Sequence, residues 1–481
     1  MMDPKTSRVL RVLPILTITG FCVSIAFMAL AGLCRFPATV PPLDGDGLFP
    51  RLRWTPDSDL WVTGILWTAM ISGVISLTAG LLAVRQGWRP RPGRLVAVGS
   101  LAIAVLVIAP PMGTTDTMDY VVYGRMAALG YNPHVMTPRQ FRAQGDPVGA
   151  LAPEPWQDIP SVYGPLATAT EWAASEMPGG SATSTVFWLK IWNALAFLAA
   201  ALALDRLAGP DRSRRVRVHL LWTLNPLMLW ALIGGAHVDG LAVGFAVAGL
   251  AVAGPAILRS GLAGLLLGAA AAVKAPYLLL GAGAAWAVRR APRSLLALGV
   301  GATTILVAGY AVIGTAGITA TTRRSESPSW NTPWQLLIPL IGRLPSWLSL
   351  ASLVLAVAVA ALLLRTRPYD LGKGAAWLGT ALAICTAWVV TTPVYYPWYE
   401  ALVFPLVALY PATRLDWIQL ARALVATLGC LPGVAFRLGD PWLRSAMMHG
   451  PLPYLVPVAL LILVLALVGE AALRRTARDV L

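Results

Sequence analysis

The chain has 481 residues, of which 57% are hydrophobic and 12% are charged, against roughly 25% charged in an average soluble domain. Apolar runs of about 20 residues, the length that crosses the hydrocarbon core of a bilayer, recur along the whole chain. This pattern excludes an ordinary soluble protein and predicts an all-α polytopic membrane protein. The net charge of +15 does not indicate nucleic-acid binding, because no basic stripe with interleaved aromatics is present.

About 13–14 transmembrane segments are expected, and several are shorter than a normal crossing. The pair at 261–288 is interrupted by Lys274-Ala275-Pro276 and resembles broken helices that line a cavity. The segment 401–412 is the least secure crossing. The expected spans are 12–34, 60–84, 95–111, 185–205, 218–235, 240–258, 261–273, 276–288, 295–315, 346–364, 375–391, 401–412, 422–436 and 454–472.

The distribution of charge predicts the orientation. With the N-terminus inside, the cytoplasmic side collects 24 Lys and Arg and the outer side 11, while Asp and Glu number 7 and 15. Cytoplasmic segments of membrane proteins carry an excess of Lys and Arg. We therefore expect a multi-pass membrane protein with both termini in the cytoplasm. Its richness in Ala, Gly, Leu and Arg is compatible with a bacterial cell membrane as the location.

This orientation places one long loop, residues 112–184, outside. Stretches near 117–129 and 166–177 could lie as amphipathic helices on the membrane surface. At the start of the loop is Asp116-Thr-Met-Asp119-Tyr120. A partly desolvated carboxylate here can act as a general base towards a hydroxyl. The alternative is that Asp116 or Asp119 caps the helix that follows.

Two further polar clusters lie near the ends of apolar runs. His237 and Asp239 form the outer mouth of a tight hairpin, either as a polar pair facing a water-filled site or with Asp239 as a helix cap. Lys274 follows at a helix break, where it either binds a lipid phosphate or extends its charge to the interface. No metal-ligand spacing is seen, and neither a metal nor another cofactor is expected.

Aromatic residues and a pair of arginines complete the candidates. Tyr163, Trp398 and Tyr399 could contact a sugar ring, although the run that includes the last two also suits an interfacial aromatic belt. Arg323 and Arg324 could clamp a phosphate, because the guanidinium group matches phosphate oxygens, or they could be solvated loop residues.

Read in order, these pieces resemble one enzyme family. The motifs are Ala109-Pro110-Pro111-Met112 leading to Asp116…Tyr120, Gly130…Asn132-Pro133, Tyr163-Gly164-Pro165-Leu166, Asn225-Pro226, Gly235-Ala236-His237, Val273-Lys274-Ala275-Pro276 and Pro397-Trp398-Tyr399. The set is similar to that of the actinobacterial polyprenol-phosphomannose-dependent α-(1→6)-mannosyltransferases, which have the membrane fold called GT-C. The resemblance covers roughly residues 95–400.

The resemblance implies a GT-C-like bundle whose long first core outer loop carries the catalytic aspartate and surface helices. Residues 1–94 would be an extension of two helices, 95–345 the catalytic module, and 346–481 the C-terminal helices. Asp116 would be the base. Mannose would pass with inversion from a polyprenyl-phosphate-mannose donor to a lipid-linked α-(1→6) mannan acceptor, in lipomannan or lipoarabinomannan synthesis.

The sequence departs from the family pattern in the extra carboxylate Asp119 and in the Val238 that follows His237. Both departures bear on sugar and acceptor specificity. One rival hypothesis is a transporter or flippase for a polyprenyl-linked lipid, since broken helices and charges within the membrane occur there too. Another is a transferase using a different polyprenyl-phosphate sugar, such as arabinofuranose.

Overall fold

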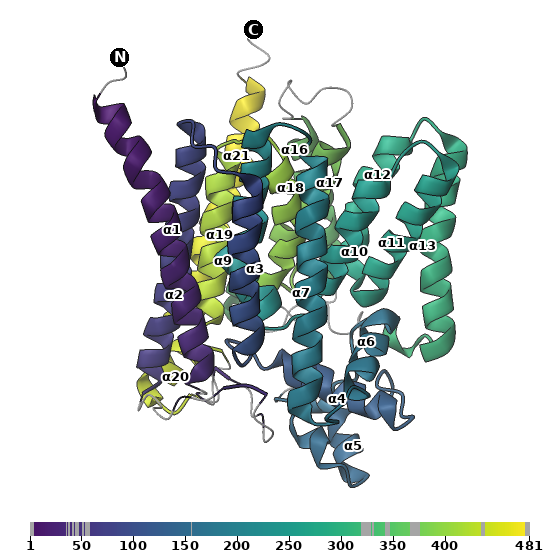
Figure 1. Cartoon of the computed structure of the whole chain (residues 1–481). Coiled ribbons are helices and arrows are strands. Elements are labelled where there is room, and N and C mark those ends of the chain that lie inside the picture. Colours follow the sequence, from purple (N-terminus) through teal and green to yellow (C-terminus); the bar gives the residue numbers. More distant parts are fainter. Residues whose placement is uncertain are drawn as a thin grey trace.

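A computed structural model shows a bundle of long helices (Figure 1). It describes residues 4–34, 36, 39–40, 43, 48–50, 52, 58–154, 156–318, 329, 331–341, 347–365, 376–433 and 438–476. These residues form helices and no strand. Seven described helices are long and apolar enough to cross a membrane, and further apolar helices are shorter. The prediction of an all-α polytopic membrane protein is therefore confirmed.

The first part of the chain supplies three long helices and then a group of short ones. The long helices are α1 (Pro4–Leu33), α2 (Asp59–Arg85) and α3 (Pro92–Ile108). The short ones are α4 (Asp116–Ala128), α5 (Pro138–Ala143), η1 (Pro147–Ala150), η2 (Trp156–Asp158) and α6 (Pro165–Ser175). The two stretches expected to form amphipathic surface helices, near 117–129 and 166–177, form the helices α4 and α6, and most residues of α4 are buried.

The middle of the chain is more irregular. It contains α7 (Ala182–Leu207), α8 (Arg212–Val218), η3 (His219–Thr223), α9 (Pro226–Met228), η4 (Leu229–Gly234), α10 (Asp239–Val252), α11 (Ile257–Val273), η5 (Ala275–Leu280), α12 (Gly281–Val288) and α13 (Pro292–Ile313). The interruption predicted at Lys274 is present between α11 and η5.

The C-terminal part completes the bundle. Its helices are η6 (Pro333–Leu337), α15 (Ile338–Ile341), α16 (Leu348–Arg365), α17 (Ala376–Thr391), η8 (Pro397–Leu402), α18 (Phe404–Leu409), α19 (Leu415–Cys430), α20 (Pro441–Met448) and α21 (Leu452–Thr476).

One helix begins earlier than its apolar run predicts. A span was expected from residue 422, but α19 begins at Leu415. Its first turns contain Asp416, which pairs with Arg217 of α8 at 3.0 Å. Arg422, nearly two turns further along, pairs with Glu400 of η8. Because the charges are neutralised by partners from other helices, they can lie inside a buried helix that hydropathy alone would shorten.

Close approach of small residues fixes the helices next to the Lys274 break. A Cβ added to Gly264 of α11 would lie 2.1 Å from the carbonyl oxygen of Leu298 in α13. One added to Gly301 of α13 would lie 2.4 Å from the carbonyl oxygen of Gly261. Small residues on facing helices allow such backbone contact inside a membrane, where van der Waals packing drives association.

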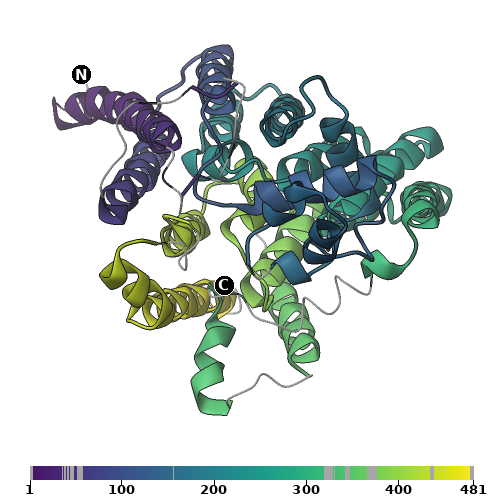
Figure 2. The same ribbon diagram turned by 90° about the horizontal axis from the view of Figure 1, so that it is seen from below.

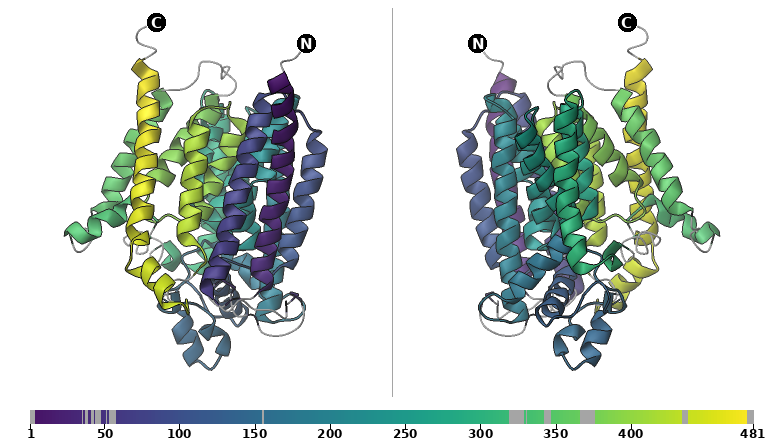
Figure 3. Two further views of the ribbon diagram at one scale, coloured as in Figure 1. Left: turned by 90° about the vertical axis from the view of Figure 1, so that its left-hand side faces the viewer. Right: turned by 90° about the vertical axis from the view of Figure 1, so that its right-hand side faces the viewer.

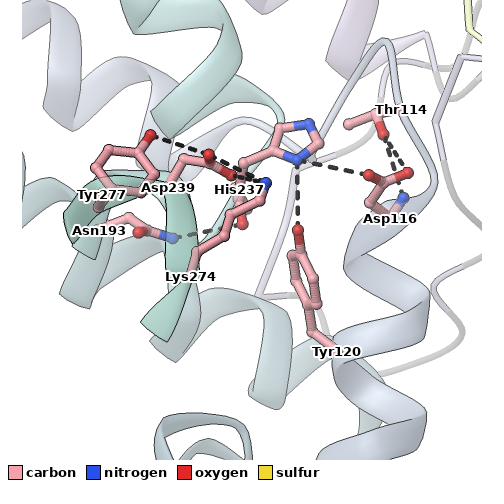
Figure 4. A network of polar contacts seen from close by, with 9 residues as sticks. Thr114, Asp116, Tyr120, Asn193, His237, Asp239, Lys274 and Tyr277 are labelled. Atoms are coloured by element: carbon pink, nitrogen blue, oxygen red, sulfur yellow. Dashed lines mark hydrogen bonds and ion pairs between the residues drawn. The ribbon is translucent and has the colours of Figure 1, made fainter. Parts of the chain in front are cut away.

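The bundle has two different ends. The short helices α4, α5 and α6 lie at one end of the bundle, and the start of α1 and the end of α21 lie at the other (Figures 1 and 3). Seen from below, these short helices lie over part of the bundle, with α1 and α2 at one edge (Figure 2). The polar motifs that contain Asp116, His237 and Lys274 meet where these short helices join the bundle (Figure 4).

Candidate active site

Asp116 is the first residue of α4, immediately after the connection from α3. Thr114 holds it: the Thr114 hydroxyl donates to Asp116 Oδ1 at 3.1 Å and accepts from the Asp116 amide at 3.2 Å. The connection is itself fixed, because the amide of Met112 donates to the carbonyl of Gly234, 3.1 Å away at the end of η4. The carboxylate side chain is 19% exposed, so it is partly desolvated yet accessible.

The His237 hairpin is held from α7. The Asn193 carbonyl oxygen accepts from the amide of Leu241 at 3.0 Å, and its amide group donates to the carbonyl of Ala236 at 3.4 Å. Ala236 has a φ of 53°, a left-handed conformation that a residue with a Cβ rarely adopts. The strained turn places the His237 ring between the neighbouring helices.

His237 points to α4. Its Nδ1 lies 3.7 Å from Asp116 Oδ2 and 3.4 Å from the hydroxyl of Tyr120, one turn further along the helix (Figure 4). Burial first, and the charge of Lys274 second, hold the pKa of His237 well below its usual value. The ring is therefore neutral near neutral pH, and Asp116 gains no cationic partner from it.

A second group forms on the other side of His237. The Lys274 ammonium lies 2.8 Å from Asp239 Oδ2 and 3.1 Å from Oδ1, and the Tyr277 hydroxyl donates to Oδ1 at 2.9 Å (Figure 4). Asp239 is fully buried, whereas the Lys274 side chain is 12% exposed. The pairing satisfies a buried carboxylate and leaves the ammonium reachable from one side.

Aromatic rings surround both groups. The Trp398 ring stacks on His237 with centroids 3.6 Å apart, and Tyr396 stacks on Trp398 at 4.8 Å. Lys274 Nζ lies 4.3 Å from the ring centroid of Tyr399 and 5.9 Å from that of Tyr163. Aromatic faces attract cations, so these rings stabilise the ammonium without neutralising it.

A cavity of about 280 Å³ lies beside these groups and is lined by some of their members. Its walls carry a carboxylate from Asp116, an ammonium from Lys274 and apolar residues of α16, including Leu353 and Ala356. Leu353 is 60% exposed on the outer surface of the bundle. The cavity thus joins a charged interior to an apolar side that faces the surrounding membrane. Its lining also includes Trp156, Tyr163, Trp388, Tyr396, Trp398 and Tyr399.

The structure brings most of the residues predicted from sequence together. Asp116, Tyr163, Lys274, Trp398 and Tyr399 line the cavity. Tyr120, His237 and Asp239 are buried and support it through the contacts above, whereas Asp119 is buried in α4 and is not part of the lining. Arg323 and Arg324 lie outside the described residues.

Sequence reasoning missed several supporting residues. Asn193 lies within an apolar run, where a buried amide is costly unless bonded, and that cost was the available signal. Tyr277 follows Lys274 by three residues, but its bond to Asp239 joins segments 38 residues apart. Thr114 lies two residues before Asp116 and could have been recognised as a local partner of the carboxylate. Within the described part of the chain, no group of three or more His, Cys, Asp or Glu could hold a metal ion.

Comparison with known proteins gives one family. Residues 18–290 match the sequence model of the family described as "Alpha-(1->6)-mannopyranosyltransferase, N-terminal domain". That segment contains Asp116, His237, Asp239 and Lys274. No solved structure matches the chain.

Curated relatives agree with this match. The chain is 24% identical over 387 residues to alpha-(1->6)-mannopyranosyltransferase B of Corynebacterium glutamicum, covering 69% of this chain and 64% of the relative. It is 27% identical over 144 residues to a probable alpha-(1->6)-mannopyranosyltransferase of Mycolicibacterium smegmatis, covering 30% and 26%. An alpha-(1->6)-mannopyranosyltransferase of Mycobacterium tuberculosis is 26% identical over 147 residues, covering 30% and 24%. The matched part of the chain thus spans less than two thirds of the length of each of these relatives.

Proposed function

Because the chain belongs to the α-(1→6)-mannopyranosyltransferase family, whose N-terminal-domain model matches residues 18–290, we propose that it is a membrane mannosyltransferase. Its donor is polyprenyl-phosphate-mannose, and its acceptor is an α-(1→6)-linked, lipid-anchored mannan. The observation that carries this proposal is that the carboxylate of Asp116 and the ammonium of Lys274 lie in the walls of the same cavity.

Asp116 is the general base of the proposed reaction. Its carboxylate accepts the proton of the acceptor hydroxyl as the oxygen forms a bond to the anomeric carbon of mannose. The bond from that carbon to the phosphate oxygen breaks, and its electron pair leaves with the lipid phosphate. Attack opposite to the leaving group converts the β-linked donor into an α-linked product. Thr114 holds the carboxylate by its hydrogen bonds, and neutral His237 leaves it without a cation that would weaken its basicity.

Lys274 stabilises the departing phosphate. Its ammonium has three N–H donors, and Asp239 takes up those that face the protein interior. The 12% exposed side chain lines the cavity, where a phosphate oxygen can be bound. A cation fixed where negative charge develops lowers the barrier without reorganisation during the reaction. Arg323 and Arg324 remain proposed as additional phosphate ligands.

The aromatic and buried polar residues bind the sugar. Trp398 and Tyr399 offer ring faces to the cavity, and Tyr163 lies opposite with its ring 5.2 Å from that of Tyr120. Asp119, His237 and Asp239 are buried behind this lining, so their proposed effect on the sugar hydroxyls passes through the residues that line the cavity. The apolar wall at Leu353 and Ala356 gives the polyprenyl chain a path between the cavity and the membrane.

The active site opens on the extracytoplasmic side. The arginine-rich turns at 85–94, 206–217 and 289–293 lie at the end of the bundle opposite to α4–α6. A positive cytoplasmic side is the usual arrangement. This supports cytoplasmic termini and an active site that faces the cell envelope.

The test is an assay with the purified full-length protein, polyprenyl-phosphate-mannose and a short α-(1→6) mannoside. We expect an α-(1→6)-extended product from the wild type and a loss of on the order of 10²–10⁴-fold with Asp116→Asn. Asp119→Asn, one turn along the same helix, is the matched control and retains more activity. Equal turnover by wild type and Asp116→Asn at equal folded amounts would remove the catalytic assignment. If product forms only when polyprenyl-phosphate-arabinofuranose is the donor, the proposed donor sugar is arabinofuranose and not mannose.

A further inference from the structure

A second polar cavity, of about 270 Å³, lies at the other end of the bundle. It is formed by the end of α2, the start of α8 and the turn between α18 and α19. The beginning of α2 lies near α20, since Asp59 accepts from the amide of Asp440, so its final residue, Arg85, is at the end where the termini lie (Figure 1). The cavity is therefore separate from the candidate active site.

Four arginines line this cavity, and one is already committed to the fold. Arg217 is 7% exposed, pairs with Asp416 at 3.0 Å and donates to the carbonyls of Val407 and Tyr410. These bonds join α8 to the α18–α19 turn. Asp416 is the one carboxylate among the described residues that line the cavity, and Arg217 neutralises it. The pair contributes no net charge to a ligand.

The other three arginines leave a surplus of three positive charges. Arg85, Arg89 and Arg214 are exposed and line the same cavity. Across the part of the chain that the structure describes, none of them forms an ion pair with a carboxylate. Converging guanidinium groups repel one another, and an anion between them removes this repulsion.

Two of the three arginines, Arg85 and Arg89, already have side-chain contacts within the protein. The Arg85 guanidinium lies 5.0 Å from the ring centroid of Trp417, and Arg89 donates to the carbonyl of Trp88 at 2.9 Å. The hydroxyl-bearing Ser213 adds a donor to the same lining. Side chains already fixed by such contacts lose less entropy when they bind a ligand.

A second group of three arginines at the same end of the bundle serves as a comparison, because none of them lines this cavity. Arg289, Arg290 and Arg293 carry the same three charges in the α12–α13 turn, at the same end of the bundle. They are exposed and line none of the cavities described here. Arg289 also lies over an aromatic ring, 4.4 Å from the centroid of Trp286. The difference between the two groups is therefore that the arginines of the first one line a shared cavity.

We propose that Arg85, Arg89 and Arg214 bind a phosphate group, and that this group belongs to an anionic phospholipid of the leaflet on that side. The guanidinium fork matches phosphate oxygens. The three residues lie just beyond helices that cross the membrane, which is the level of the lipid headgroups. Basic pockets between membrane helices at this depth suit acidic headgroups. The proposal does not depend on the reaction at Asp116.

The test measures lipid retention by the purified, delipidated full-length protein. Phosphatidylglycerol, phosphatidylcholine and inorganic phosphate are added in separate titrations, and bound lipid is counted by native mass spectrometry. We expect saturable binding of phosphatidylglycerol that Arg85→Gln/Arg89→Gln/Arg214→Gln weakens on the order of a hundredfold, since three charges near the headgroup are lost. The control Arg289→Gln/Arg290→Gln/Arg293→Gln removes the same charge elsewhere and should change the affinity less than about twofold.

Equal weakening by both triple variants would overturn the proposal, because it would reduce the effect to general surface charge. Equal retention of phosphatidylcholine would do the same. If inorganic phosphate displaces the lipid at about equal concentration, the site binds free phosphate, and the proposal of a lipid ligand is wrong. Thermal unfolding without lipid checks that each variant is folded. If the triple variant is not folded, Arg89→Gln and Arg214→Gln are measured singly, and an unchanged affinity in both rejects the site.

Discussion

The ammonium of Lys274 lies 2.8 Å from Oδ2 of Asp239, and the two residues are neighbours only because a helix break turns Lys274 back towards the His237 hairpin. The carboxylate is completely buried. It therefore depends on Lys274 and on the Tyr277 hydroxyl for compensation. This dependence gives the pair a structural role besides the one proposed for Lys274 in catalysis.

Loss of Lys274 should destabilise the protein. Lys274→Met leaves a buried charge without its partner, which costs about 3–5 kcal/mol. Lys274→Met/Asp239→Asn should recover a large part of that loss. A double-mutant cycle from detergent-solubilised unfolding measures the coupling between the two residues. Strict additivity of the two single changes would contradict the pairing.

Close packing between α4 and α6 predicts a second effect on stability. A Cβ added to Gly124 would lie 2.4 Å from the carbonyl oxygen of Glu171, which is backbone and cannot rotate away. Gly124→Ala should therefore cost about 1–3 kcal/mol of unfolding free energy through overpacking. Gly299→Ala in α13 is the control, because nothing lies within 4 Å of the added Cβ. The thermal unfolding midpoints of the two variants measure this difference. Equal midpoints for Gly124→Ala and Gly299→Ala would contradict the contact.

Glu171 should make stability depend on pH. Both carboxyl oxygens are buried and have no hydrogen-bond partner in the described structure, and burial holds the pKa of Glu171 well above its usual value. The folded state therefore keeps a proton that the unfolded state releases near pH 4.5. The contribution of this proton to stability is complete below that pH and is lost as the pH rises through the folded-state pKa.

Glu171→Gln removes this titration while keeping the shape of the side chain. At about pH 8 the variant should be more stable than wild type, because folding of the wild type then requires proton uptake by Glu171, at a cost of about 1.4 kcal/mol for each pH unit between the unfolded-state and folded-state pKa. At about pH 5 the two proteins should differ less. Unfolding midpoints over this range measure the difference, and parallel pH profiles for the two proteins would disprove the titration at Glu171.

Labelling of single cysteines tests the orientation. In a background without the four native cysteines, Gln144→Cys next to α5 should react with an impermeant maleimide on intact cells. Arg290→Cys, in the α12–α13 turn, should react only after permeabilisation. Both positions are exposed in the structure. The reverse labelling pattern would place the active site in the cytoplasm.

Hydropathy and local motifs predict much of the fold because a bilayer imposes a minimum apolar length on each crossing. They predict the helix break at Lys274 from Pro276, and they predict helices at α4 and α6 from amphipathic stretches of the long loop. They fail at Leu415, where α19 begins with charged residues. Whether a charge can enter a helix depends on partners such as Arg217, almost 200 residues away in sequence.

In the candidate site, individual residues could be predicted from the sequence, but the contacts between them could not. Asp116, His237 and Lys274 are ionisable residues at the ends of apolar runs, and such placement can be recognised from sequence. The pairing of Lys274 with Asp239, and the stacking of Trp398 on His237, join separate segments. No local pattern specifies which of several polar residues will meet across the bundle, so these contacts required the structure.

The stacking of Trp398 on His237 also shows that the site is not confined to the matched family segment. A fragment ending at residue 290 would retain Asp116, His237 and Lys274. It would lack Trp398 and Tyr399, so one side of the cavity would be open. The part of the chain after residue 290 can thus reshape the entrance without altering the ionisable groups. Chimaeras that exchange this part between relatives would change which sugars and lipids are admitted while the charged centre stays the same.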